Sequence, residues 1–507
     1  MSEALPTSKV VWFVFVLSLW SLLVICLLHV PMQRQMLIAT INNSTSTSTQ
    51  PSELLPDVSF VYSRAYIDNR AQNASFVRFL VLRNCATNEW LSNKRNSNNR
   101  LESTLTFHKR SHHDLTVPLE IVHLHGKSNC PWRWAPGCQL SAHYFTASLS
   151  RKLQNRQVSA ISLCHRRSCV HPSPITVTPP TPHAQHPLLV CVLPLYLFAD
   201  VSLLVVFLET WRSLGATKFV IYVSSVTEDV RRVLAAYERK AVVLVLEWPM
   251  LPTVDDDTQP GGAVDPNGQV YRFGHVLALN DCIYRSAPLA RFVAPVDVDE
   301  FVFLTNETRP TSLIPFLERQ FAANNKRTAA TALASLEFVH RRVHYNRTQR
   351  SRPGLRWLDS LQWSAEPPGP SKYIFRADLV SVLGNHQVLR PATSAERVVP
   401  NQAALYHLRI SNILPSSNDS SAPALRPFAH LSIRKQHIHA GLIAATMNAS
   451  GSLPSRQMVA TKVVSCLSNW KATGCKVPHR SCAPLLNLTK WHVAGTHTRN
   501  GDRFLVV

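Results

Sequence analysis

The stretch from residue 188 to residue 296 alternates short apolar runs with segments of helical length. The runs LLVCVLPLY, KFVIYVSS, AVVLVLEWP and RFVAPV are typical of buried strands. Asp200 stands where a helix N-cap is expected, and Gly215 stands where the same helix should end. Strands that alternate with helices form βαβ units, so this region predicts an α/β fold, a mostly parallel sheet with helices on both faces.

Three carboxylates follow the last of these strands, in the sequence RFVAPVDVDEFVF. Asp297, Asp299 and Glu300 would lie at the carboxyl end of a parallel strand, where open α/β sheets bind ligands. If the backbone stays extended, alternation places Asp297 and Asp299 on one side. Two hard oxygen donors of this kind suit Mn²⁺ or Mg²⁺, which takes its other ligands from phosphate and water. We therefore expect Asp297 and Asp299 to be catalytic, in a sugar-nucleotide transferase whose ion stabilises the leaving diphosphate.

Other interpretations of the acidic cluster remain open. An Asp-x-Asp pattern also arises by chance. A phosphatase of the haloacid dehalogenase type ends a strand in the same pattern, but it places the motif at the start of its catalytic domain. Here about a hundred residues of α/β pattern precede Asp297. A surface calcium site is a further alternative, although EF-hand spacing is absent and the apolar flanks indicate burial.

The N-terminal region predicts a membrane anchor. Residues Val10–Val30 carry no charge and are long enough to cross about 30 Å of hydrocarbon. No small-x-small cleavage site follows them, which favours a retained signal anchor over a cleaved signal peptide. N-glycosylation sequons lie only beyond this segment, from Asn42 to Asn487. We expect a type II membrane protein with a cytosolic tail at 1–9, a transmembrane segment at 10–30 and a Ser/Thr-rich flexible stem at 31–57.

The remainder divides into three parts by composition. Residues 58–187 show short apolar runs between polar segments and predict a luminal β-rich accessory region. It ends in the Pro-rich stretch His171–Pro187, which marks a boundary because proline interrupts helices and central strands. We assign 188–440 to the catalytic domain and 441–507 to a Cys-containing C-terminal extension.

Cysteine content and charge limit the class of protein. The chain has 11 cysteines, and ten remain when Cys26 of the apolar segment is set aside. In an oxidising lumen these could form five disulfides whose connectivity cannot be deduced from sequence. Zinc is the alternative, but no CxxC pair is present. The net charge of +22 comes without any nucleic-acid-binding motif, so we expect anionic substrates and no nucleic acid.

Several segments together resemble glycosyltransferase family 92. The run YRFGHVLALNDCIYRSAPLARFVAPVDVDEFVFL is similar to the family's Asn-Asp-Cys helix followed by a strand that ends in Asp-x-Asp-Glu-Phe. KYIFRADLVSVLGNHQV resembles its Lys-x-Ile-x-Arg segment, and ALYHLRI its late His-x-Arg segment. The resemblance covers roughly 188–412. It implies a GT-A-like domain in a Golgi-resident type II protein that transfers galactose from UDP-galactose, with inversion, to a glycan acceptor.

The resemblance also implies roles for particular residues. Asp299 would hold the metal, and Asp297 the ribose or a metal-bound water. His407 would complete the coordination, with His386 as second choice. The candidates for contact with the nucleotide are Asp297, Arg376, Lys372 and Asp281. For Arg376 and Lys372 a solvated strand face is the alternative, and for Asp281 a structural hydrogen bond.

The general base and the acceptor stay open. The segment ALASLEFVHRRVH departs from the family's aromatic and Gly-rich acceptor segment. An inverting enzyme needs a base to deprotonate the attacking hydroxyl, and Glu337, Asp359 and Glu366 are equal candidates for it. The divergence motivates a second hypothesis, a catalytically inactive family member that acts as a membrane-tethered glycan-binding or partner protein. An oligomer is compatible with either hypothesis.

Overall fold

The computed structural model describes parts of the chain from residue 58 onward. The described residues are 58–70, 74–84, 103–108, 115–124, 138–149, 160–165, 168–178, 184–255, 263–305, 312–323, 332–346, 358, 361–363, 369–391, 395–411, 462–463, 465–466, 475, 482, 486 and 491–507. Within these residues no helix is both long and apolar enough to cross a bilayer. The predicted tail, anchor and stem all lie outside the described part.

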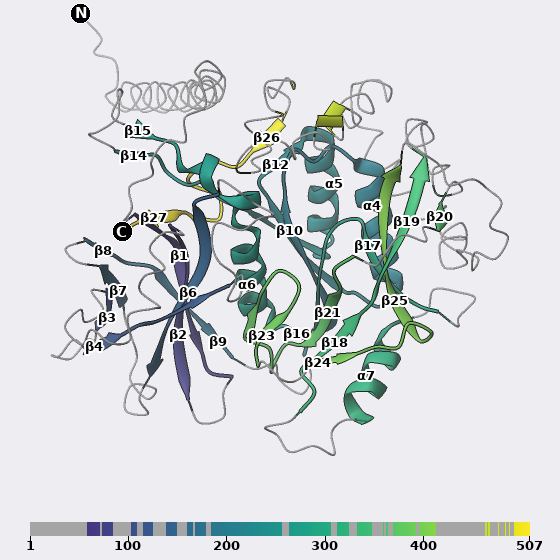
Figure 1. The fold of residues 1–507 in the computed structure, drawn as a ribbon, viewed down its shortest axis with the longest axis horizontal. Helices are drawn as coiled ribbons and strands as arrows, with labels where there is room; N and C mark the ends of the chain where they lie inside the picture. Colours follow the sequence, from purple (N-terminus) through teal and green to yellow (C-terminus); the bar gives the residue numbers. More distant parts are fainter. Residues whose placement is uncertain are drawn as a thin grey trace, which may run out of the picture.

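A seven-stranded central sheet forms the middle of the molecule (Figure 1). Its order is β13 (Val243–Glu247), β11 (Lys218–Val223), β10 (His186–Leu195), β16 (Ala290–Val296), β21 (Lys372–Arg376), β18 (Ser335–Phe338) and β24 (Ala395–Arg397). The first four strands are parallel, whereas β21 runs antiparallel to both of its neighbours. The sheet is therefore mixed but mostly parallel, as the βαβ pattern predicts, because β18 and β24 also pair in parallel and only β21 of these seven strands is reversed.

Helices cover both faces of the central sheet, as the sequence pattern predicts. The alternation along β10 shows why: Leu188 and Val190 face one apolar core, and Leu189 and Cys191 face another. The first core contains buried side chains of α4 (Val201–Ser213), α5 (Glu228–Arg239) and α7 (Ile314–Ala323). The second contains those of α6 (His275–Ser286).

The boundaries of α4 follow from single residues. The Asp200 side chain accepts a hydrogen bond from the Leu203 backbone N–H at 2.8 Å, which confirms the expected N-cap. After the helix, Gly215 adopts φ +105°, a left-handed conformation that favours glycine. A Cβ at this position would also lie 2.7 Å from Ser312 Oγ.

The region before the central sheet is built almost entirely of strands. Its accessory sheet has the order β27 (Phe504–Val506), β1 (Ser59–Asp68), β2 (Ser75–Asn84), β6 (Leu140–Leu149) and β5 (Glu120–His123), with β9 (Ser173–Val177) also paired to β1. A smaller sheet has the order β4 (Leu115–Pro118), β3 (Ser103–His108), β7 (Ala160–His165) and β8 (Ser168–Val170). Strand β9 lies inside the Pro-rich stretch that we expected to be only a boundary, and its single partner makes it an edge strand, where Pro174 is tolerated.

The accessory sheet and the central sheet share one apolar core. Figure 1 shows α6 between the two sheets. On the accessory side, Tyr62 of β1 stacks on Trp248, with ring centroids 5.1 Å apart. Leu82 of β2 belongs to the same buried cluster as Ile283 of α6. The accessory region is thus packed against the domain of the central sheet as part of one hydrophobic unit.

The C-terminal segment joins both parts. Strand β26 (Trp491–Val493) pairs with β12 (Ser225–Thr227), which follows β11, and β27 pairs with β1 of the accessory sheet. Four disulfides occur among the described residues: Cys138–Cys475, Cys164–Cys169, Cys191–Cys282 and Cys466–Cys482. The expectation that these eight cysteines form disulfides is confirmed, whereas Cys85 and Cys130 lie outside the described residues.

The remaining elements lie outside the central and accessory sheets. They are β14 (Val254–Asp255), β15 (Ala263–Val264), η2 (Pro266–Gln269), η3 (Tyr271–Gly274), β17 (Glu300–Leu304), β19 (His340–Asn346), β20 (Gln362–Trp363), β22 (Val382–Leu383), β23 (Val388–Arg390) and β25 (Ala403–Ser411). Of these, β17, β25, β19 and β20 form a four-stranded sheet in that order.

Candidate active site

The three carboxylates Asp297, Asp299 and Glu300, here called the carboxylate cluster, lie in a tight turn directly after β16. The Glu300 backbone N–H donates to the Asp297 carbonyl at 3.0 Å, and the Asp297 N–H donates to Glu300 Oε2 at 2.9 Å. The extended backbone that we expected from Asp297 to Asp299 is therefore wrong, because these reciprocal hydrogen bonds close a turn. Strand order reverses at β10, which lies between β11 and β16, so the cluster sits where open α/β sheets bind ligands.

Lys372 neutralises one side of the cluster. Its Nζ lies 3.1 Å from Asp297 Oδ2 and 3.3 Å from Glu300 Oε2, and its side chain is buried. Burial alone would raise the pKa of Asp297, but the charges of Lys372, Arg272 and His407 outweigh it and hold the pKa well below its usual range. Lys372, a candidate for contact with the nucleotide, therefore adjoins the carboxylate cluster.

Asp299 is tied to the neighbouring strand β25. Its Oδ2 lies 3.2 Å from His407 Nε2, and its carbonyl accepts from the Leu408 N–H at 2.8 Å. Burial lowers the pKa of His407, but the charge of Asp299, the hydrogen bond to it and the charge of Glu300 together outweigh burial and raise the pKa. At Asp299 burial raises the pKa of the carboxyl, but the charge of His407, the hydrogen bond to it and the charge of Arg409 together lower it. The two aspartates therefore have different partners, and they are close enough that the charge of Asp297 affects the pKa of Asp299.

Glu300 has a structural role within the cluster. It is 2% exposed, and its backbone carbonyl accepts a hydrogen bond from Trp211 Nε1 of α4 at 3.0 Å. Burial raises the pKa of Glu300 despite the nearby Lys372. Its side chain closes the turn and leaves Asp297 and Asp299 as the carboxylates that reach solvent, with 37% and 27% of their side chains exposed.

Arg272 is a cation of the site that sequence reasoning missed. It lies in η3, just before α6, with φ +45°, a conformation that is uncommon for a residue with a side chain. Its guanidinium packs over the ring of Tyr271, 5.3 Å from the centroid. The charge of Arg272 lowers the pKa of Asp297 second only to that of Lys372. A non-glycine residue with positive φ beside a functional cluster is a recognised structural signal, but it is not visible in sequence.

The residues fit a divalent ion only in part. Among the described residues, no group of three or more His, Cys, Asp or Glu side chains is arranged to hold a metal. Asp297 and Asp299 are hard oxygen donors, and Mn²⁺ or Mg²⁺ sites in phosphate-binding enzymes use one or two carboxylates plus phosphate oxygens. His386 lies in the turn between β22 and β23, where burial and then the charge of Lys372 lower its pKa to about 4. The aspartates could hold an ion that takes its remaining ligands from a diphosphate.

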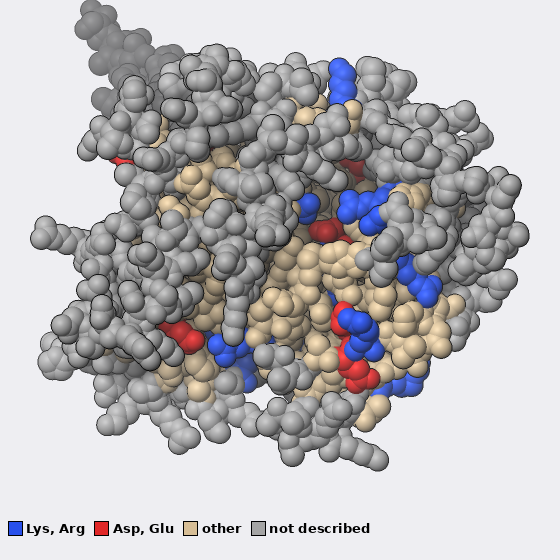
Figure 2. All heavy atoms as spheres, in the orientation of Figure 1, with Lys and Arg blue, Asp and Glu red and all other residues tan. Residues whose placement is uncertain are grey.

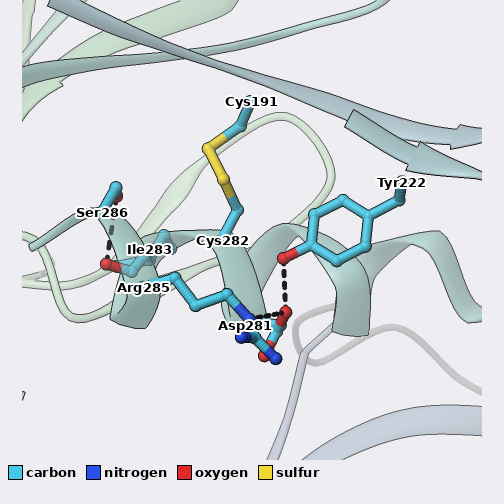
Figure 3. The surroundings of a disulfide bond; sticks show 7 residues. All are labelled: Cys191, Tyr222, Asp281, Cys282, Ile283, Arg285 and Ser286. Carbon is cyan, nitrogen blue, oxygen red and sulfur yellow. Dashed lines mark hydrogen bonds and ion pairs between the residues drawn. A yellow bond between two sulfur atoms is a disulfide. The ribbon is translucent and has the colours of Figure 1, made fainter. Parts of the chain in front are cut away.

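The Asn-Asp-Cys motif of α6 is structural. Asn280 donates to the Leu383 carbonyl at 2.8 Å and accepts from the Leu383 N–H at 3.0 Å. Cys282 forms the disulfide to Cys191 of β10, shown in Figure 3. Its sulfur is therefore part of a disulfide and is not a free thiol.

Asp281 does not face the carboxylate cluster. Its carboxylate accepts hydrogen bonds from the hydroxyls of Tyr66 and Tyr222 and from Arg285 Nε (Figure 3 shows the last two). The side chain is 0% exposed, so it has no surface to offer a nucleotide. The expectation that Asp281 binds the nucleotide is therefore wrong, because both oxygens of its carboxylate already accept hydrogen bonds from side chains of the protein.

Arg376 is also misplaced by the sequence prediction. It lies at the end of β21 opposite to Lys372, roughly 13 Å away at the usual rise of a strand. Its guanidinium pairs with Asp378 at 2.6 Å. The expectation that both cations face one diphosphate is wrong, because only Lys372 adjoins the cluster.

Of the three candidates for the general base, Glu337 is the one that lies among the described residues. Glu337 of β18 pairs with Arg397 of β24, with Oε1 3.0 Å from Nη2. Asp359 and Glu366 lie outside the described residues. Figure 2 shows the wider setting: near the middle of this face, acidic atoms lie in a hollow between basic side chains.

Residues 186–437 match the family model described as "Glycosyltransferase family 92". This region of the chain belongs to glycosyltransferase family 92. The match begins at the first residue of β10 and includes the carboxylate cluster, Lys372 and His407. No curated protein matches the chain significantly.

Several solved glycosyltransferase structures show a loose similarity to the family 92 chain. TarS of S. aureus, in complex with UDP-GlcNAc, is 11% identical, with a TM-score of 0.25 over 54% of this chain and 70% of that one. The mannosyltransferase PcManGT of Pyrobaculum calidifontis, in complex with GDP-Man and Mn²⁺, is 15% identical, with a TM-score of 0.22 over 62% and 90%. Glucosyl-3-phosphoglycerate synthase of Mycobacterium tuberculosis is 12% identical, with a TM-score of 0.22 over 52% and 82%.

Proposed function

We propose that this protein transfers a hexose, galactose from UDP-galactose, with inversion to a glycan acceptor, and that it needs Mn²⁺ or Mg²⁺. The observation that carries the proposal is the pair of part-exposed aspartates, Asp297 and Asp299, at the switch point of the central sheet. Their pKa values are lowered, so both are ionised at neutral pH and available to a cation.

The cluster's own residues account for donor binding. Asp297 and Asp299 would hold the ion, which when bound supplies positive charge that stabilises the leaving diphosphate. Lys372 keeps its proton because Asp297 and Glu300 raise its pKa against the effect of burial. With Arg272 it places two permanent positive charges next to the aspartates, and these charges favour an anionic diphosphate over other ligands.

We further propose that the protein works in the Golgi lumen, anchored by residues 10–30 in type II orientation. The four disulfides support an oxidising compartment. Expression with a reporter at each end, followed by protease protection of Golgi vesicles, tests this orientation. Protection of residues beyond the anchor is expected, and their digestion in intact vesicles would contradict it.

Turnover of the nucleotide sugar tests the enzymatic proposal. The chain from about residue 58 should release UDP from UDP-galactose in the presence of Mn²⁺ and an acceptor glycan library. A screen of other nucleotide sugars under the same conditions identifies the donor. Equal turnover in excess chelator would remove the metal from the proposal. If no sugar nucleotide is turned over while UDP still binds, the alternative of an inactive glycan-binding or partner protein takes its place.

A further inference from the structure

One face of the four-stranded sheet carries a group of basic side chains beside Asp299. In β19 and β25, which pair in parallel, Arg342 is opposite His407 and His344 is opposite Arg409. Residues opposite each other on neighbouring strands have their side chains on the same face of the sheet. Four side chains therefore share one face, here called the basic face: Arg342, His344, His407 and Arg409.

Two contacts confirm which side chains point to the basic face. His340 is two residues before Arg342, and its Nε2 lies 2.8 Å from Nδ1 of His407. On the opposite face, the guanidinium of Arg341 packs over the ring of Tyr406, 5.9 Å from the centroid. Arg341 therefore points away from the basic face, although it is the next residue in sequence to Arg342.

Arg409 lies beside the turn that holds Asp299. Strand β17 runs antiparallel to β25 with Glu300 opposite His407, so Arg409, two residues further along β25, lies past the start of β17. The Leu408 N–H donates to the Asp299 carbonyl at 2.8 Å, which fixes this end of β25 against the turn. Arg409 is also close enough to act electrostatically, because its charge, after that of His407, lowers the pKa that burial raises at Asp299.

The cations of the basic face act together. Arg409 is exposed to solvent, and within the described part of the chain it forms no ion pair. Arg342 is half-buried on the neighbouring strand. Burial and then the charges of Arg342 and Arg409 lower the pKa of His344, so both charges are felt at the same place. The face thus presents permanent positive charge, and the guanidinium donors of Arg409 are open to a ligand.

The carboxylate cluster has different cations on its two sides. Lys372 and Arg272 act on Asp297, whereas Arg409 lies beside Asp299. Figure 2 shows basic atoms on either side of the acidic atoms in the central hollow. Under the proposed function, the diphosphate uses the ion and the cations beside Asp297. In a transfer with inversion the acceptor attacks the sugar from the face opposite the leaving group, so a second anion at the basic face would come from the acceptor.

We propose that the basic face binds an anionic substituent of the acceptor glycan, a carboxylate or a phosphate, and that Arg409 forms the ion pair that selects it. The proposal rests on the proposed function, since it names the class of acceptor for the same site. A guanidinium can donate two parallel hydrogen bonds to either oxyanion, which gives selectivity against a neutral glycan. The proposal also makes specific the anionic substrate that we expected from the net charge of +22.

Glycan binding without nucleotide tests the proposal independently of catalysis. Full-length protein in detergent is titrated over an array of glycans printed as matched neutral, sialylated and phosphorylated forms. An acidic form should bind at least about tenfold more tightly than its neutral parent, and this difference should shrink at high ionic strength. The sialylated and phosphorylated forms separate the carboxylate from the phosphate. Equal affinity for neutral and acidic forms, or no binding of any acidic form, overturns the proposal.

Variants then assign the preference to the basic face. Arg409→Gln should weaken binding of the preferred acidic glycan by about tenfold, the cost of losing a hydrogen bond to a charged group. Arg409→Lys should fall between Arg409→Gln and wild type, because it keeps the charge but loses the planar fork. Arg341→Gln is the matched control, since it removes the same charge from the opposite face. A loss with Arg341→Gln equal to that with Arg409→Gln would show non-specific attraction and contradict the proposal.

Calorimetric binding of UDP with Mn²⁺ separates the acceptor from the donor. Arg409→Gln should change the affinity for UDP far less than the affinity for the acidic glycan. Equal losses for UDP and for the glycan would place Arg409 in the donor site and overturn the proposal. If wild-type protein fails to bind UDP, the proposed function fails while the array still decides whether the basic face selects acidic glycans. If UDP binds and no acidic glycan is preferred, the proposed function stands and this inference fails.

Discussion

Two groups of carboxylates, Asp281 with Asp502 and Asp297 with Asp299, differ in the partners of their oxygens. Asp281 and Asp502 are 0% and 1% exposed and share Arg285, with tyrosine hydroxyls completing the hydrogen bonds of Asp281. Asp297 and Asp299 reach solvent and have single cationic or imidazole partners. The first group uses all its acceptors within the protein, whereas the second keeps acceptor capacity for a ligand. A carboxylate's neighbours, more than its presence in a motif, therefore indicate whether it serves the fold or the chemistry.

Asp281→Ala should give the largest loss of stability. It removes the acceptor of two buried hydroxyls and leaves Arg285 with Asp502 alone. Removing one partner of a buried ion pair typically costs about 3–5 kcal/mol. Urea unfolding of the chain from residue 58 measures it, with Asp378→Ala as the control. The Arg376–Asp378 pair is part-exposed, so the control should cost no more than about 1 kcal/mol, and similar values for the two variants would contradict the comparison.

Lys372→Met should have a smaller effect on stability that depends on metal. The variant leaves Asp297 and Glu300 without their cation, but Asp297 can be hydrated, so a loss of about 1–3 kcal/mol is expected. Mn²⁺ held by Asp297 and Asp299 would supply positive charge beside Asp297 and should restore part of the stability. Thermal unfolding with and without Mn²⁺ measures this. A larger Mn²⁺-induced rise in Tm for the variant than for wild type is expected, and equal rises would indicate that the ion does not bind at this cluster.

Glu337→Gln should lower turnover by less than about tenfold, because its carboxylate is already paired with Arg397. Loss of a true general base costs about 10²–10⁴-fold. Steady-state kinetics with the donor identified by the screen decide the point. A loss of a hundredfold or more would show that Glu337 is the base and that an ion pair does not mark a carboxylate as structural.

The two groups should also respond to pH in opposite directions, which is the smallest effect expected. Burial raises the pKa of Asp502, whose arginine partners only partly offset it, so its ionisation costs stability as pH rises above about 4. At Asp299 the pKa is lowered, so its contribution is present above about pH 4 and is lost as pH falls through the folded-state value. The loss in free energy of unfolding caused by Asp502→Asn, relative to wild type, should become smaller as pH rises from about 4 to 7. The loss caused by Asp299→Asn should become larger as pH rises to about 4. Unfolding curves across this range measure both, and the same sign for both variants would contradict the account.

Local features of the fold could be predicted from sequence. The strands and helices between residues 188 and 296 follow from apolar periodicity, and the cap at Asp200 and the left-handed Gly215 follow from residue type. The antiparallel β21 and the edge strand β9 could not be predicted in the same way. Their places depend on pairing between segments far apart in the chain, for which short-range patterns carry no signal.

The site shows the same division. The position of Asp297 and Asp299 at a strand end was predictable, whereas the ion pair between Asp297 and Lys372 was not. The turn that replaces the extended backbone depends on the Glu300 side chain folding back to the Asp297 amide. Asp281 and Arg376 were misassigned because a motif does not reveal which partners approach from the other side of a helix or strand. The His340–His407 contact joins residues 67 positions apart and leaves no trace in sequence.

The most direct test of the central claim is calorimetric binding of UDP to the chain from residue 58, with and without Mn²⁺. We predict binding by wild-type protein only when Mn²⁺ is present, and its loss in Asp299→Asn while the variant's unfolding at pH 7 stays cooperative. Binding of UDP with equal affinity in excess chelator, or unchanged Mn²⁺-dependent binding by Asp299→Asn, would contradict the claim that these aspartates hold a cation for the nucleotide.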